Sequence, residues 1–128
     1  MAYKYDKILL VDDNEIDNFV NHRMMEIVSF SRHIVLKQSE KEALAYLRNE
    51  CQKDADYPDF VFISPGVSSD AGSNFTQEVK KLSSNPSKNK VIILSIFDDP
   101  DHLKMIEKRI SVFKALSKPL TIEELNKI

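Results

Sequence analysis

Polar side chains that could do chemistry stand at the ends of short apolar runs in this sequence. Asp12 and Asp13 follow one such run, Ser64 and Ser95 end two others, and Lys118 precedes a proline after a fourth. Adjacent carboxylates make an oxygen-rich site of the kind that suits Mg²⁺, which usually takes one or two carboxylates and keeps several waters. The pattern predicts a charged site, with simple helix capping as the alternative role of the two aspartates.

The apolar runs alternate with segments of helical periodicity, and this alternation predicts βαβ units around a parallel sheet. We expect strands near 7–11, 33–37, 59–64, 91–95 and 112–116, and helices near 15–30, 40–52, 73–84, 100–110 and 121–127. In an open parallel sheet, ligands bind outside the carboxyl ends of the strands. This topology therefore gathers the polar side chains at one edge of the sheet.

The polarity of the strands predicts their order in the sheet. The strands at 7–11, 59–64 and 91–95 are apolar almost throughout, as expected of central strands covered on both faces, whereas 33–37 is more mixed and belongs nearer an edge. We therefore predict a flavodoxin-like (βα)5 fold with strand order 2-1-3-4-5. The chain length fits a single domain over residues 1–128.

Local signals define the helices further. Helix 15–30 carries an apolar stripe at helical spacing that is expected to face the sheet, formed by Ile16, Phe19, Val20, Met24, Ile27 and Val28. Capping residues are expected at Asp13 or Asn14, at Ser39 with Glu42, and at Thr121 with Glu124.

The order of these strand-end residues resembles the receiver domain of two-component response regulators (CheY-like), over essentially the whole chain. In that family an acidic pair holds Mg²⁺, an Asp after the third strand accepts phosphate from a histidine kinase, a Ser or Thr senses it, and a Lys before Pro contacts the phosphoryl group. Asp12, Asp13, Ser95 and Lys118 fall on the matching positions, and Ser64 stands where the acceptor Asp would be. The resemblance implies a receiver that is degenerate at the phosphoacceptor position.

A serine does not replace the acceptor aspartate chemically. A carboxylate forms a high-energy acyl phosphate, whereas a serine hydroxyl is a poor nucleophile without a general base, and its product is a stable ester. We therefore expect signalling without phosphorylation at Ser64. The alternative is a receiver that is still phosphorylated at Ser64 or at another residue, such as Asp59 or Asp70, with a conventional on/off switch.

Loss of the third carboxylate also weakens the expected metal site. Asp12 and Asp13 facing the cation of Lys118 leave a local charge of only about −1, so Mg²⁺ is expected to bind weakly at best. The sequence predicts that Lys118 instead pairs with Asp12 or Asp13 and holds the pocket in one fixed arrangement.

Other positions depart from the family pattern too. Ser68 stands where a proline is usual, four residues after the acceptor position, although Gly72 keeps the family's glycine. The aromatic residue of the family's switch, three positions before the lysine, is Ala115 here. Phe113 is a candidate substitute because side chains two apart on a strand share a face. Without the aromatic residue, two roles explain Ser95 equally well: a hydroxyl at the end of a strand, or a switch residue.

The composition excludes several classes of function. The chain has 128 residues, and 42% are hydrophobic and 30% charged, as in an ordinary globular protein. A formal net charge of −2 gives no attraction for nucleic acid. No apolar run suits a membrane span or a signal peptide, so a cytoplasmic location is expected. Cys51 is the only cysteine, which excludes an internal disulfide.

The expected function is that of a protein-interaction module and not of an enzyme, since no glycine-rich nucleotide-binding motif is present. The resemblance implies a signalling protein as partner: a histidine kinase, a phosphotransfer protein or an output protein. Ile96 and Phe97, directly after Ser95, place apolar side chains near the surface that the family uses for output. The chain itself is expected to be a monomer or a weak homodimer.

Overall fold

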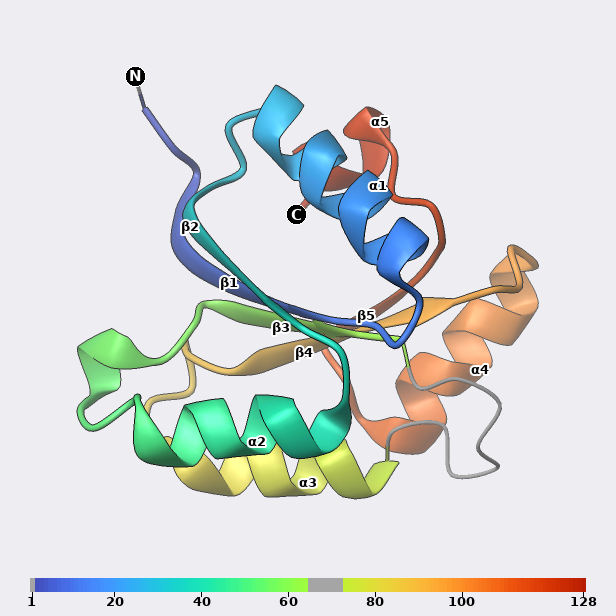
Figure 1. Cartoon of the computed structure of the whole chain (residues 1–128). Helices are drawn as coiled ribbons and strands as arrows, with labels where there is room; N and C mark the ends of the chain where they lie inside the picture. Colours follow the sequence, from blue (N-terminus) through green and yellow to red (C-terminus); the bar gives the residue numbers. More distant parts are fainter. Residues whose placement is uncertain (1, 65–72) are drawn as a thin grey trace.

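The computed structural model describes residues 2–64 and 73–128. These residues form a parallel sheet with helices on both faces (Figure 1). In these residues the strands are β1 (Tyr5–Val11), β2 (Ser31–Lys37), β3 (Phe60–Ile63), β4 (Lys90–Ser95) and β5 (Lys114–Ser117). The helices are α1 (Glu15–Ile27), α2 (Glu40–Asn49), α3 (Ser73–Leu82), α4 (Pro100–Ile110) and α5 (Ile122–Asn126). The strand order β2-β1-β3-β4-β5 confirms the predicted flavodoxin-like topology.

The element boundaries differ from the prediction by a few residues. Helix α1 ends at Ile27 and not at residue 30, because the chain turns at Ser29, which has a φ of 51° in the left-handed region. Strand β5 begins at Lys114, two residues later than expected. A short 3₁₀ helix, η1 (Asp54–Asp56), lies between α2 and β3 and was not predicted.

Two apolar layers, one on each face of the sheet, hold the helices in place. Helices α1 and α5 cover one face, and α2, α3 and α4 cover the other (Figure 1). Ile8 and Leu10 of β1 point into the layer under α1 and α5, whereas Leu9 and Val11 point into the opposite layer. Successive side chains of a strand alternate between faces, so each central strand contributes to both layers and reads as an unbroken apolar run.

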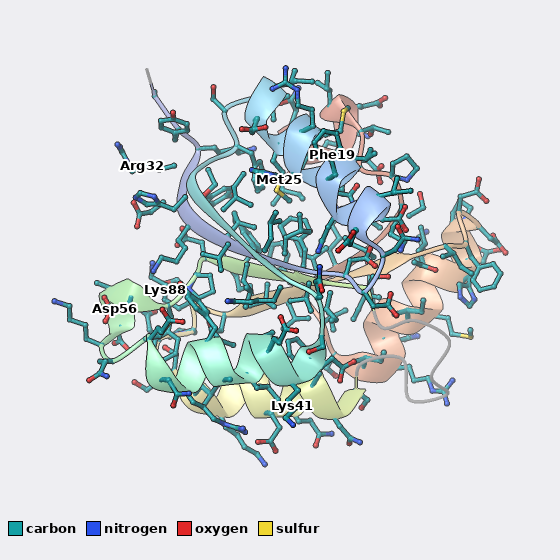
Figure 2. All side chains as sticks on the ribbon, in the orientation of Figure 1. Phe19, Met25, Arg32, Lys41, Asp56 and Lys88 are labelled. Atoms are coloured by element: carbon teal, nitrogen blue, oxygen red, sulfur yellow. The ribbon has the colours of Figure 1, made fainter. Side chains whose placement is uncertain are left out.

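The predicted orientation of α1 is wrong for most of its apolar stripe, although Met24 and Val28 are partly buried and pack against the core. Ile16, Phe19 and Ile27 are 73%, 67% and 54% exposed. The side chains that α1 buries are Asn18, Asn21 and Met25. Figure 2 labels one residue of each kind, the exposed Phe19 and the buried Met25, and Met25 lies between the helix and the sheet.

Hydrogen bonds of the two asparagines explain this orientation. The Asn18 side-chain amide donates to the carbonyls of Asp12 (3.0 Å) and Lys37 (3.1 Å), at the carboxyl ends of β1 and β2. The Asn21 side-chain oxygen accepts the backbone N–H of Leu120 at 2.9 Å. Buried backbone groups need such partners. The face of α1 that carries Asn18, Asn21 and Met25 therefore turns inward. The exposed apolar side chains of the helix are Ile16, Phe19, Val20 and Ile27.

The predicted caps are present at three helices. Asn14, Ser39 and Thr121 each accept a backbone N–H from the first turn of the helix that follows. The helices among residues 2–64 and 73–128 are all too short or too polar to span a membrane.

Candidate functional site

The carboxyl ends of β1, β3 and β5 bring three of the predicted site residues into contact. The Lys118 ammonium donates to Asp12 Oδ2 at 3.0 Å and to Ser64 Oγ at 2.9 Å. Asp12 follows β1, Ser64 follows β3, and Lys118 follows β5 and is joined to Pro119 by a cis peptide bond. The predicted pairing of Lys118 with the acidic pair is realised through Asp12.

Asp17 is a site residue that the sequence analysis missed. Its Oδ2 accepts a hydrogen bond from the Lys118 ammonium at 2.8 Å. Asp17 lies in the first turn of α1, three residues after the capping Asn14, whose side chain accepts the Asp17 N–H. An acidic residue in the first turn of a helix is ordinarily explained by the helix dipole. The sequence pointed to a site role for Asp17 only through the expected start of this helix beside the predicted pocket.

Charge and burial fix the ionisation of the lysine. Lys118 has a side chain only 10% exposed, against a fully buried Asp12 and an Asp17 that is 37% exposed. Burial alone would lower the pKa of Lys118, but the hydrogen bonds and charges of Asp17 and Asp12 outweigh burial and raise the pKa above its ordinary value. The lysine is therefore an ammonium ion at neutral pH, held by two carboxylates.

The two adjacent aspartates have different environments. Asp12 uses both of its oxygens, one for Lys118 and the other as acceptor of the Asn14 N–H at 3.0 Å. Asp13 is exposed. Asp12 and Asp13 therefore do not present a common pair of free oxygens.

This donor set fits a divalent cation poorly. Mg²⁺ requires oxygen ligands in near-octahedral geometry, yet the ammonium of Lys118 already occupies one Asp12 oxygen. Across residues 2–64 and 73–128, no group of three or more His, Cys, Asp or Glu side chains is placed to hold a metal ion. The positive charge in this site belongs to the protein itself.

Ser95 has a structural role in the loop after β4. Its hydroxyl oxygen accepts the backbone N–H of Phe97 at 3.0 Å, and its carbonyl accepts the N–H of Lys118 at 2.8 Å. The first contact stabilises the turn that follows the strand, and the second joins β4 to the residue that carries the ammonium. Ser95 thus helps to position Lys118 through the backbone.

The contacts of Ser64 bear on its reactivity. A serine nucleophile needs a neighbouring base that takes its proton. Within residues 2–64 and 73–128, the side chain that contacts Ser64 Oγ is that of Lys118, whose ammonium carries no lone pair with which to accept a proton. The lysine and the serine are therefore not arranged as a nucleophile with its base.

The other candidate acceptor among the described residues, Asp59, lies at the opposite edge of the sheet. Asp59, considered as an acceptor, lies just before β3 at its amino end, forms an ion pair with Lys88 at 3.0 Å, and accepts the N–H groups of Asp6 and Lys7. Asp59 thus connects the amino-terminal parts of β1 and β3 with the segment just before β4. Asp70, Ser68 and Gly72 fall outside the described residues.

The prediction that Phe113 substitutes for the aromatic switch residue is wrong. Phe113 lies before β5, and its N–H bonds to the carbonyl of Val91 near the start of β4. Its ring packs on Phe60, with centroids 5.2 Å apart. These neighbours belong to the amino ends of the strands, opposite the edge that carries Lys118, because parallel strands all begin at the same edge.

Comparisons with solved structures find similar proteins over nearly the full length. The chain is 30% identical to a two-component response regulator from Cytophaga hutchinsonii, with a TM-score of 0.76 over 97% of this chain and 93% of that one. A response regulator receiver protein from Dyadobacter fermentans (21% identity, TM-score 0.74, 98% and 94% covered) and a two-component response regulator from Legionella pneumophila (21%, 0.71, 95% and 93%) share the fold. The sequence matches no protein-family model and no curated protein.

Proposed function

The chain belongs to the receiver domain family of two-component response regulators, and we propose that it is an atypical receiver that binds a signalling partner without taking up phosphate at Ser64. One observation carries the proposal: the Lys118 ammonium is bound by Asp12, Asp17 and Ser64 at once. A lysine held in this way keeps the pocket in one arrangement without a phosphoryl group. In this reading Asp17 supplies the carboxylate that an acceptor aspartate at position 64 would have supplied.

Electrostatics support the absence of phosphorylation. Asp12, Asp17 and Lys118 together leave the pocket with a net charge of about −1 at neutral pH. An incoming phosphodonor is itself an anion, and the lysine that would attract it is already neutralised by two carboxylates. Among the described residues, the side chain that contacts the Ser64 hydroxyl is an ammonium and not a base. Transfer of a phosphoryl group to this serine is therefore disfavoured by the charge of the pocket and by the lack of a proton acceptor in that contact.

Weak binding of Mg²⁺ is part of the same proposal. A metal ion would have to displace the ammonium from Asp12 or be held by the exposed Asp13 with water. Displacement would leave a largely buried cation beside a divalent cation, which is unfavourable. We therefore expect the domain to function without a metal.

An exposed apolar patch beside the site supports the role of an interaction module. Ile96 and Phe97, in the loop between β4 and α4, are 69% and 56% exposed, and Met105 of α4 is exposed as well. The Ser95 hydroxyl bonds to the N–H of Phe97, so this patch is tied directly to the strand end next to Lys118. Exposed apolar patches mark binding surfaces. The partners that we propose are a histidine kinase, a phosphotransfer protein or an output protein.

The test is incubation with acetyl phosphate and Mg²⁺, followed by the intact mass of the protein. We expect no phosphoryl adduct on the unaltered protein and an adduct on Ser64→Asp, with Ser64→Ala as the matched control that removes the hydroxyl without adding a carboxylate. An adduct on the unaltered protein would contradict the proposal. Loss of that adduct in Ser64→Ala would then identify Ser64 as the modified residue and support the alternative, a phosphorylated receiver.

A further inference from the structure

A hollow of about 400 Å³ lies at the amino ends of β4 and β5, at the opposite edge of the sheet from Lys118. Its walls are the end of α3, the loop from α3 to β4 and the loop from α4 to β5. Small-molecule sites have volumes of about 300–1,000 Å³. The hollow is therefore large enough for a small ligand, and the proposed function does not use it.

Three lysines from separate segments line this hollow. Lys80 lies near the end of α3, Lys88 lies in the loop before β4, and Lys90 is the first residue of β4. In the sequence they belong to two separate basic clusters, and the fold places both clusters around one space. Lys88, labelled in Figure 2, pairs with Asp59 at 3.0 Å. The other two lysines have no carboxylate partner among the described residues.

Lys80 and Lys90 both keep N–H groups that a ligand can use. The Lys80 ammonium donates to the carbonyl of Ser111. The Lys90 ammonium lies over the rings of Phe60 and Phe113, at 4.6 Å and 5.2 Å from their centroids. An ammonium has three donors. A single carbonyl occupies one of them, and contacts with ring faces satisfy the charge only in part. Both side chains can therefore donate to an anion.

The balance of charge around the hollow is positive. Two carboxylates lie near it: Asp59, which pairs with Lys88, and Asp54, which accepts a hydrogen bond from the Ser83 hydroxyl at 3.4 Å. Against three ammonium groups these carboxylates leave a net charge of about +1. The pocket around Lys118 has the opposite sign, so a small anion is attracted to the hollow in preference to that pocket.

The rest of the lining includes apolar side chains. Val91 is buried, Val112 is partly buried, and the side chain of Phe113 is 53% exposed. Ligand sites combine an apolar lining with a few charged groups that fix the orientation of the ligand. A ligand that fills this hollow therefore carries an apolar part beside its anionic group.

We infer that the hollow binds a small organic phosphate, with the phosphate on Lys80 and Lys90 and the apolar part against Val112 and Phe113. A phosphate monoester has a charge of about −1.5 to −2 and three acceptor oxygens, so it can accept hydrogen bonds from two ammonium groups on different elements at once. The inference goes beyond the proposed function and does not depend on it.

Titration of the full chain with phenyl phosphate, followed by amide NMR at constant ionic strength, tests the site. This probe joins a phosphate to a flat apolar group, and inorganic phosphate and phenol are the two partial probes. We expect saturable shifts at residues 89–91 and 111–113, with a dissociation constant on the order of 1 mM for a ligand of this size. Inorganic phosphate should bind at least about threefold more weakly, and phenol should not saturate below about 10 mM.

Lysine variants assign the binding to the hollow. Lys80→Met and Lys90→Met each remove one ammonium and keep most of the apolar length, and each should weaken the binding of phenyl phosphate at least about fivefold. Lys81→Met is the matched control, because Lys81 carries the same charge next to Lys80 but pairs with Glu78 at 3.5 Å and does not line the hollow. It should change the binding by less than about twofold. Circular dichroism confirms that each variant is folded.

Four outcomes would contradict the inference. No saturable binding of phenyl phosphate up to about 10 mM would overturn it. An equal loss in Lys81→Met and Lys80→Met would also overturn it, because general surface charge would then explain the binding. Shifts centred on residues next to Asp12 would place the anion at Lys118 instead. Equal binding of inorganic phosphate and phenyl phosphate would overturn the apolar part of the ligand. None of these results bears on phosphorylation at Ser64, which the intact mass measures separately.

Discussion

Replacement of Lys118 by methionine should destabilise the fold, because it leaves a fully buried carboxylate without its cation. Asp12 is 0% exposed and receives the ammonium at 3.0 Å. Methionine keeps most of the apolar length of the lysine side chain, so the change removes charge and hydrogen bonds more than volume. The experiment therefore isolates the electrostatic part of the network.

The expected loss follows from the exposure of each partner. Removing one member of a buried ion pair costs roughly 3–5 kcal/mol, and this applies to the pair with the buried Asp12. Asp17 is 37% exposed and can be solvated by water, so its share is that of a surface pair, about 0–1 kcal/mol. We expect the free energy of unfolding to fall by about 3–6 kcal/mol in total.

Urea unfolding followed by circular dichroism measures this loss, and a double-mutant cycle assigns it. Lys118→Met/Asp12→Asn has no unpaired carboxylate, and the asparagine can still accept the Asn14 N–H that Asp12 accepts. The double variant should therefore regain about 2 kcal/mol or more relative to Lys118→Met alone. A loss below about 1 kcal/mol in Lys118→Met, or a double variant no more stable than the single one, would refute the reasoning.

Further predictions concern pH, the α1 anchor and the exposed patch. The pKa of Lys118 is raised in the folded protein, so its stabilising contribution is present below the ordinary pKa of 10.5 and is lost as the pH rises through the folded value. The free energy of unfolding should therefore fall in that alkaline range. Lys118→Met should lack this part of the pH dependence. Asn21→Ala leaves the buried N–H of Leu120 without its 2.9 Å acceptor and should cost about 1–3 kcal/mol in urea unfolding; an unchanged midpoint would show that water replaces the amide. Ile96→Ala/Phe97→Ala removes only exposed side chains and should change stability by no more than about 0.5 kcal/mol, so that any larger shift in melting would argue for a structural role of the patch.

The sheet could be predicted from sequence because its signals are local and redundant. Central strands such as β1 and β4 carry an unbroken apolar run that covers both faces, and a polar residue, Asp12 or Ser95, comes directly after that run. Capping residues such as Ser39 and Thr121 mark helix starts independently of the strands. With alternating strands and helices, the right-handed crossover rule leaves few topologies.

The orientation of α1 and the role of Asp17 could not be predicted in the same way. Apolar periodicity assigns the apolar face to the core, but Asn18 and Asn21 are drawn inward by backbone groups from segments distant in sequence, Lys37 and Leu120. The pairing of Asp17 with Lys118 spans 101 residues. Such contacts depend on tertiary placement, and no local pattern encodes them.

A magnesium titration tests the central claim most directly, namely that the pocket uses its own Lys118 ammonium in place of a divalent cation. Amide NMR shifts of residues next to Asp12 report binding in the unaltered protein and in Ser64→Asp, which adds a carboxylate where Ser64 contacts the ammonium. We predict no saturable binding up to about 10 mM Mg²⁺ in the unaltered protein and at least about tenfold tighter binding in Ser64→Asp. Saturable binding to the unaltered protein at or below about 1 mM would contradict the account.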